Sequence, residues 1–280
     1  MTDVDPAIAR RMWQLLEPYH AVVYFSPEVA DAMRAIGLKG FWMGYFAGRS
    51  APLGPVGPEV VTALFFGFHP AMVARALPDA WTFVSPAEVL AARRTAVGTA
   101  LRRLIDDEDA VAEAATLARR ATEGCDVAGR PLFAAHGALP WPDDPYLVLW
   151  HAATLLREHR GDGHVISLAA EGLDGCSAHV AAVEAGGIPR GALQPSRGWT
   201  DEDWDAARQR LWGVDLADLR MRIEIRTDRL AVGPWSRLGM PGTERLAALM
   251  APLAERVMAA GLVPVPNPIG LPWPPTPLAS

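Results

Sequence analysis

Cysteine is scarce in this sequence, and long apolar runs are missing. The chain of 280 residues carries only Cys125 and Cys176, too few for a disulfide framework and not in a C-x-x-C pair. We interpret both as reduced, buried thiols. No run of about eighteen apolar residues occurs, so no transmembrane helix is expected. The first residues also lack the basic start and apolar stretch of a signal peptide, and together these absences predict a cytoplasmic protein.

Lysine is nearly absent, since Lys39 is the only one and every other basic residue is arginine. With the abundant alanine, glycine and proline, this composition is typical of a high-GC genome such as that of an actinobacterium. The formal net charge is −6. Non-specific binding to nucleic acid depends on clustered positive charge, so this balance disfavours nucleic acid as a partner.

The familiar catalytic motifs are missing as well. The sequence has no G-x-S-x-G nucleophile motif, no Walker A or G-x-G-x-x-G phosphate loop and no H-E-x-x-H metal pair. Neither cysteine has an activating residue beside it in sequence. The absence of these motifs leaves open whether the protein is an enzyme.

What the sequence does contain is helical periodicity. Apolar residues recur at helical spacing in residues 7–18 and 86–104, while residues 108–123 and 242–260 are amphipathic and rich in alanine. No segment shows a convincing strand alternation, and the nearest one, at 221–225, is interrupted by charge. The sequence therefore predicts a mainly α-helical fold.

Four pairs of similar segments follow one another in the same order, at offsets of about 115 to 125 residues. The matched segments are 44–53 with 163–173, 69–81 with 188–199, 85–93 with 200–208, and 133–142 with 258–266. We interpret them as two diverged copies of one module, residues 1–143 and 144–270, followed by a proline-rich tail, 271–280. The prolines of residues 140–145 mark the joint, and without a low-complexity linker the copies should pack as one body.

The second copy has the spacing of a helix-turn-helix. A helix is expected near residues 177–186 and breaks at Gly186 and Gly187; a short segment follows at 189–195, and the next helix begins at Thr200 and ends near Leu211. Its first turns carry four carboxylates in six residues, which would repel the phosphates of DNA. The alternative is a transcriptional regulator that binds DNA through the first copy, whose later arginines are Arg93, Arg94, Arg102 and Arg103.

Several segments resemble a known family. They are residues 40–49, 52–58, 149–164, 197–200 and 264–268. The chain resembles actinobacterial proteins of about 280 residues that are described as helix-turn-helix proteins and have no established activity. The resemblance implies two tandem winged-helix-like modules. This sequence departs from the family pattern at 211–226, where no obvious hairpin replaces the turn-rich wing.

Histidines occupy corresponding places in the two copies. His20 and His151 are each followed by alanine, and under a two-fold relation they would face a shared cavity. Glu158 lies within about 20° of the helix face of His151. His159 and His164 bracket an expected turn at the rim of that pocket. Because imidazole binds iron, copper and zinc, haem or a transition metal held by these four histidines is one hypothesis, with His20 and His151 as the leading ligands.

A glycine recurs at every fourth position between Gly40 and Gly48 in a segment expected to be helical. Each glycine costs about 1 kcal/mol relative to alanine, which favours a packing or ligand-binding reason for the pattern. Tyr45 and Arg49 are four positions apart on one face of this helix, and Trp42 lies close to them.

The sequence therefore predicts a protein that binds a small molecule or a cofactor in a pocket between the two copies. The predicted lining is His20, Trp42, Tyr45, Arg49, His69, His151 and Glu158. The cofactor is unknown at this point, and a homo-oligomer is compatible with the pattern. A DNA-binding regulator and a scaffold that uses the acidic helix and the proline tail are the alternatives.

Overall fold

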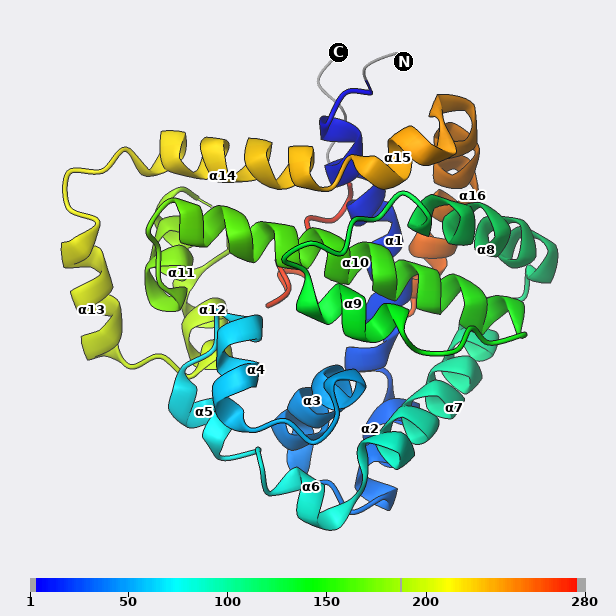
Figure 1. The fold of residues 1–280 in the computed structure, drawn as a ribbon, viewed down its shortest axis with the longest axis horizontal. Coiled ribbons are helices and arrows are strands. Elements are labelled where there is room, and N and C mark those ends of the chain that lie inside the picture. The colour runs from blue at the N-terminus through cyan, green and yellow to red at the C-terminus, as the bar shows by residue number, and fades with distance from the viewer. Residues whose placement is uncertain (1–3, 187, 276–280) are drawn as a thin grey trace.

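The computed structural model describes residues 4–186 and 188–275, and this part of the chain contains helices and no β-strand (Figure 1). The prediction of a mainly α-helical fold is confirmed. Gly187 and the last five residues of the predicted tail, 276–280, lie outside the described residues. None of the described helices combines the length and the apolar character needed to cross a lipid bilayer.

The helices follow one another with short connections. In chain order they are α1 (Ala7–Phe25), α2 (Pro27–Ala35), α3 (Gly40–Ser50), the 3₁₀ turn η1 (Ala51–Leu53), α4 (Pro58–Phe65), α5 (Pro70–Ala74), α6 (Ala80–Phe83), α7 (Pro86–Leu104), α8 (Glu108–Thr122), α9 (Pro131–Gly137), α10 (Pro145–Ala170), α11 (Gly175–Glu184), α12 (Arg190–Arg197), α13 (Asp201–Arg210), α14 (Leu216–Leu230), α15 (Gly233–Leu238) and α16 (Met240–Ala259).

The two best-capped helices begin where the sequence signals place them. Ser85 and Glu88 form a reciprocal capping box at the start of α7, and Thr200 and Asp203 form one at the start of α13. In each box a side chain accepts a hydrogen bond from a backbone N–H group that the first helical turn leaves unpaired. Gly198, in the left-handed region at φ 78°, ends α12 and turns the chain into α13.

Helix α10 lies at the centre of the fold. It packs against α1, α7, α8, α9 and α14, and Figure 1 shows α1 crossing it while α14 runs beside its second half. The predicted turn between His159 and His164 is wrong, because α10 continues through it to Ala170. Gly163 lies at a close approach instead: a Cβ there would sit 2.8 Å from Nη1 of Arg130 and 3.3 Å from Cβ of Leu230.

The buried apolar side chains form two clusters. The larger cluster joins α1 to the first half of α10 and also takes in α15 and α16. The smaller cluster lies between residues 168 and 223, from the end of α10 to α14, around the fully buried Trp204. The predicted division into copies at residue 143 stays a prediction; the two clusters meet within α10, and the chain returns to the larger one after α14.

The predicted helix-turn-helix segment is present as α11, α12 and α13, within a few residues of the expected bounds. The winged-helix description is not confirmed. A wing is a β-hairpin, whereas residues 211–226 form a turn and then most of α14. Asp215 caps that helix through its side chain, which accepts a hydrogen bond from the backbone N–H of Asp218.

Candidate functional site

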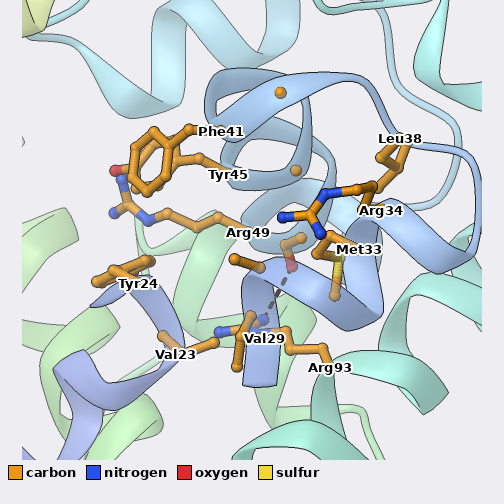
Figure 2. Close-up of a pocket in the computed structure, with 14 residues that line it drawn as sticks. Val23, Tyr24, Val29, Met33, Arg34, Leu38, Phe41, Tyr45, Arg49 and Arg93 are labelled. Carbon is orange, nitrogen blue, oxygen red and sulfur yellow. Dashed lines mark hydrogen bonds between the residues drawn. The ribbon is translucent and has the colours of Figure 1, made fainter. Parts of the chain in front are cut away.

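A cavity of about 240 Å³ opens between α1, α2, α3 and α7. Figure 2 shows its residues arranged around the axis of α3, with Phe41, Tyr45 and Arg49 on one side and Met33, Arg34 and Leu38 on the other. The complete lining is Val23, Tyr24, Val29, Ala30, Met33, Arg34, Leu38, Gly40, Phe41, Gly44, Tyr45, Gly48, Arg49 and Arg93. It combines apolar side chains with three guanidinium groups and contains no carboxylate.

The glycine-stepped face of α3 lines this cavity. A Cβ on Gly44 would lie 3.3 Å from Cβ of Met33, so this glycine lets α2 and α3 pack closely. A Cβ on Gly48 would lie 4.0 Å from Cδ of Arg93, and a Cβ on Gly40 would meet no atom within 4 Å. Two of the three glycines therefore leave open space where a larger side chain would fill the cavity.

Arg49 is held in place by a carboxylate from α10. Its Nε and Nη2 atoms donate to the two carboxylate oxygens of Glu158 at 3.0 and 2.8 Å. Glu158 also accepts from Nη1 of Arg157 at 2.8 Å. Burial by itself raises the pKa of the Glu158 carboxyl, but the two guanidinium groups outweigh it and hold that pKa well below its usual range.

This buried network continues away from the cavity into α1. Nε of Arg157 donates to Glu17 at 3.2 Å, and the indole N–H of Trp13 donates to the other oxygen of Glu17 at 3.0 Å. Burial raises the pKa of Glu17, against the opposing effect of Arg157. Two carboxylates and two arginines thus neutralise one another beneath the cavity, and the paired bonds fix the orientation of Arg49.

Arg93 has a different environment. Its side chain comes from α7, the residue is 2% exposed, and Nη1 donates to the backbone carbonyl of Gly48 at 2.8 Å. The guanidinium also lies over the ring of Trp150, 4.9 Å from its centroid. No carboxylate of the described residues forms an ion pair with it, and burial lowers its pKa. A buried positive charge that borders a cavity and lacks an anionic partner is energetically costly.

Tyr24 connects the cavity to a buried histidine. Its hydroxyl oxygen lies 3.2 Å from Nε2 of His20, whose Nδ1 lies 3.1 Å from Oγ1 of Thr154. His20 is fully buried, and this burial lowers its imidazole pKa well below the usual range. Burial also raises the pKa of Tyr24 to about 12. Both groups are therefore uncharged at neutral pH, and His20 stands behind the cavity wall.

The structure brings part of the predicted set together. Tyr45 and Arg49 line the cavity, and Glu158 holds Arg49 from behind. Trp42 belongs instead to an aromatic cluster on α3, with ring centroids 6.0 Å from Phe46 and 5.7 Å from Tyr45.

The other predicted residues lie elsewhere. His69 caps α5, where Nδ1 accepts from the backbone N–H of Ala71 at 3.1 Å. His151 lines a second cavity between α7, α9 and α10. His159 accepts from the backbone N–H of Asp126, and Nδ1 of His164 lies 3.0 Å from the hydroxyl of Thr227. Within residues 4–186 and 188–275, no group of three or more His, Cys, Asp or Glu side chains is placed to hold a metal ion.

From the sequence, Arg93 was only one of the later arginines of the first copy, and its place in the cavity wall was not predicted. The signal that could have found it is its position on α7, since Val89, Arg93 and Val97 share one helix face and the two valines are fully buried. An arginine is almost never fully buried unless it is paired, so its place on a buried face marks it for attention.

A family model described as a helix-turn-helix family covers residues 9–264, which is most of the chain. Neither the curated proteins nor the solved structures contain a match.

Proposed function

We propose that this chain, which belongs to the helix-turn-helix family matched over residues 9–264, binds a small organic anion in the cavity between α1, α2, α3 and α7. The observation that carries the proposal is Arg93, a 2% exposed guanidinium that borders an apolar cavity without a carboxylate partner. A bound anion would supply the missing charge, and in a low-dielectric site such a pair is strong.

The size and walls of the cavity define the rest of the ligand. Its volume of about 240 Å³ falls below the range of roughly 300–1,000 Å³ typical of pockets for drug-sized molecules. Valine, methionine, leucine and aromatic side chains surround it, so the body of the ligand is apolar. A carboxylate on a small aromatic ring or a short aliphatic chain fits this description.

The three arginines would contribute unequally. Glu158 already neutralises Arg49, and Arg34 is a surface residue whose side chain is 72% exposed and paired with Asp31. Arg93 is therefore the principal anion contact, Arg49 a positioned hydrogen-bond donor, and Arg34 a group at the mouth that attracts anions over a short, salt-screened range.

The test uses benzoate and hexanoate as probes and their uncharged amides as ligand controls, measured by titration calorimetry on the full chain. Gly48→Leu should weaken binding of the acids at least tenfold, because a side chain at Gly48 fills the cavity. Gly191→Leu is the matched control, since Gly191 lies in α12 and a Cβ placed on it would meet no atom within 4 Å. Arg93→Met should remove the preference for acid over amide. Equal binding of acids and amides, or unchanged binding by Gly48→Leu, would contradict the proposal.

A transcriptional regulator is the second candidate, and the family match is compatible with it. The arginines of the first half offer limited support for DNA binding there. Arg93 is buried, Arg102 pairs with Asp144, and Arg103 pairs with Glu28. A regulator would bind DNA fragments with an affinity that falls steeply with salt. Fluorescence anisotropy with labelled duplexes at salt concentrations between about 50 and 200 mM tests this, and absence of salt-sensitive binding removes the candidate.

A further inference from the structure

A second cavity, of about 220 Å³, lies between α7, α9 and α10. It is separate from the proposed anion site except that Arg93 borders both. Apolar side chains make up most of its walls: Leu90, Leu139, Pro140, Pro142, Leu147 and Trp150. Proline and tryptophan rings give it flat surfaces, which suit a planar ligand.

His136 lines this cavity and carries a ring nitrogen without a hydrogen-bond partner among the described residues. The residue is 2% exposed, and Nδ1 lies 2.9 Å from the backbone carbonyl of Leu132. A carbonyl only accepts, so Nδ1 carries the proton and donates, and the neutral ring keeps a lone pair on Nε2. Nε2 is buried and has no hydrogen-bond partner among the described residues.

His151 brings a second unpaired Nε2 from α10, and no hydrogen bond of its Nδ1 among the described residues fixes which nitrogen carries the proton. It is 6% exposed, its ring meets Trp141 edge-on at 4.7 Å between centroids, and its Nε2 is also buried without a partner in the described part of the chain. Burial lowers the pKa of both His136 and His151 to about 4, so both rings are neutral at physiological pH. Buried polar atoms are nearly always hydrogen-bonded in native proteins. Of the six buried side-chain atoms without a partner in the described residues, two belong to the histidines that line this one cavity.

We propose that this cavity is a second ligand site, for an uncharged aromatic hydroxyl compound whose hydroxyl donates a hydrogen bond to Nε2 of His136, or pairs with Nε2 of His151 as donor or acceptor. The ring of the ligand packs between the proline and leucine side chains. A carboxylate has no proton to donate to a neutral imidazole acceptor. Arg93 and Arg94 also line the cavity, so the preference for the hydroxyl compound depends on the two histidines. The specificity therefore differs from that of the anion site.

The test uses phenol as the probe and anisole as its matched control, which has the same ring and no hydroxyl proton. Titration calorimetry on the full chain should show phenol binding at least tenfold more tightly than anisole. Ala91→Phe should weaken phenol binding at least tenfold, because Ala91 is an exposed residue of α7 that lines the cavity. Ala206→Phe, at an exposed position of α13, should leave binding unchanged.

The histidines are tested by His136→Phe and His151→Phe, which keep a ring and remove its nitrogen atoms. At least one of them should reduce phenol binding to the level of anisole while the circular dichroism spectrum stays native. Ala91→Phe leaves both histidines intact, so it decides the question if these variants unfold. Equal binding of phenol and anisole, or an Ala91→Phe variant that binds phenol normally, would overturn the proposal.

The two sites can be separated in one experiment. Gly48→Leu should weaken benzoate binding and leave phenol binding unchanged, while Ala91→Phe should do the reverse. If Gly48→Leu abolishes phenol binding and Ala91→Phe does not, phenol binds in the α1–α2–α3–α7 cavity and the second site is refuted. Failure of benzoate to bind leaves the phenol result interpretable, because the two readouts use different probes and different blocking variants.

Discussion

The part of the molecule around α1, α3 and α10 and the helix-turn-helix part around α11 to α13 handle charge in opposite ways. In the first, Arg49 and Glu158 have side chains 10% and 1% exposed and lie 109 positions apart in sequence. In the second, Arg208 pairs with Glu184 and Arg210 with Asp174, and all four side chains are 36% to 54% exposed. One part buries its ion pairs next to a cavity, and the other keeps them in water.

The buried ion pairs fix the position of side chains, whereas the exposed ion pairs lie on the surface in contact with water. Burying a charge costs several kcal/mol of desolvation, which an ion pair regains only with good geometry and further hydrogen bonds. The bidentate contact between Arg49 and Glu158 and the flanking Arg157 meet that condition. Exposed pairs cost little and contribute little. The cavity-bearing part therefore gives up stability to fix guanidinium groups, whereas the helix-turn-helix part is an ordinary small helical core.

The largest effect is expected from Glu158→Gln. This change leaves the Arg49 and Arg157 guanidinium groups buried with reduced compensation, and we expect the free energy of unfolding to fall by about 3–5 kcal/mol. Urea denaturation followed by circular dichroism measures it. A loss below about 1 kcal/mol would mean that water reaches these groups and that the buried network does not distinguish this part of the molecule.

Lowering the pH should reduce the stability of the protein, because the part that holds the buried ion pairs also holds buried histidines. The folded-state pKa of His136 and of His151 is lowered to about 4, whereas an unfolded histidine titrates near 6.5. Below about pH 6.5 the unfolded chain thus binds more protons, so stability is complete above that pH and is lost as the pH falls towards 4. Each such histidine contributes a slope of up to about 1.4 kcal/mol per pH unit within this window.

Urea denaturation at a series of pH values from about 7 down to about 4.5 measures that slope. His136→Phe and His151→Phe should each make it shallower, and a double variant should make it shallower still. If both single variants keep the slope of the unchanged chain, the two imidazoles are not held neutral by burial. The unpaired Nε2 atoms would then have access to water, which would also weaken the case for a second ligand site.

Features that depend on a few neighbouring residues could be predicted from the sequence. Helices α7, α8 and α16 lie where helical periodicity placed them, and α13 begins where Thr200 and the acidic first turn predicted it. These signals are local, since capping and amphipathic spacing act within a few residues. The predicted turn between His159 and His164 is wrong because Gly163 makes room for Arg130 within a continuous helix.

The candidate site depends on contacts that no local pattern encodes. Tyr45, Arg49 and Glu158 were each singled out, but the pairing of Arg49 with Glu158 joins α3 to α10 across the fold. His136 gave no signal, because its significance comes from an unpaired Nε2 in a cavity that three helices form together. The equivalence proposed for His20 and His151 concerned their places in sequence, and their surroundings differ: both ring nitrogens of His20 have partners, and Nε2 of His151 has none among the described residues.

The smallest loss of stability is expected when an exposed ion pair of the helix-turn-helix part is removed. Glu184→Gln removes the partner of Arg208, an ion pair 3.1 Å long between side chains 36% and 52% exposed. Water and salt screen both groups, so the free energy of unfolding should fall by only about 0.2–1 kcal/mol. The measurement is the urea denaturation used for Glu158→Gln, at the same pH and salt, because both variants neutralise one glutamate in the same way. Equal losses from the two variants would show that exposure does not set the value of these pairs, and the contrast between the two parts of the molecule would fail.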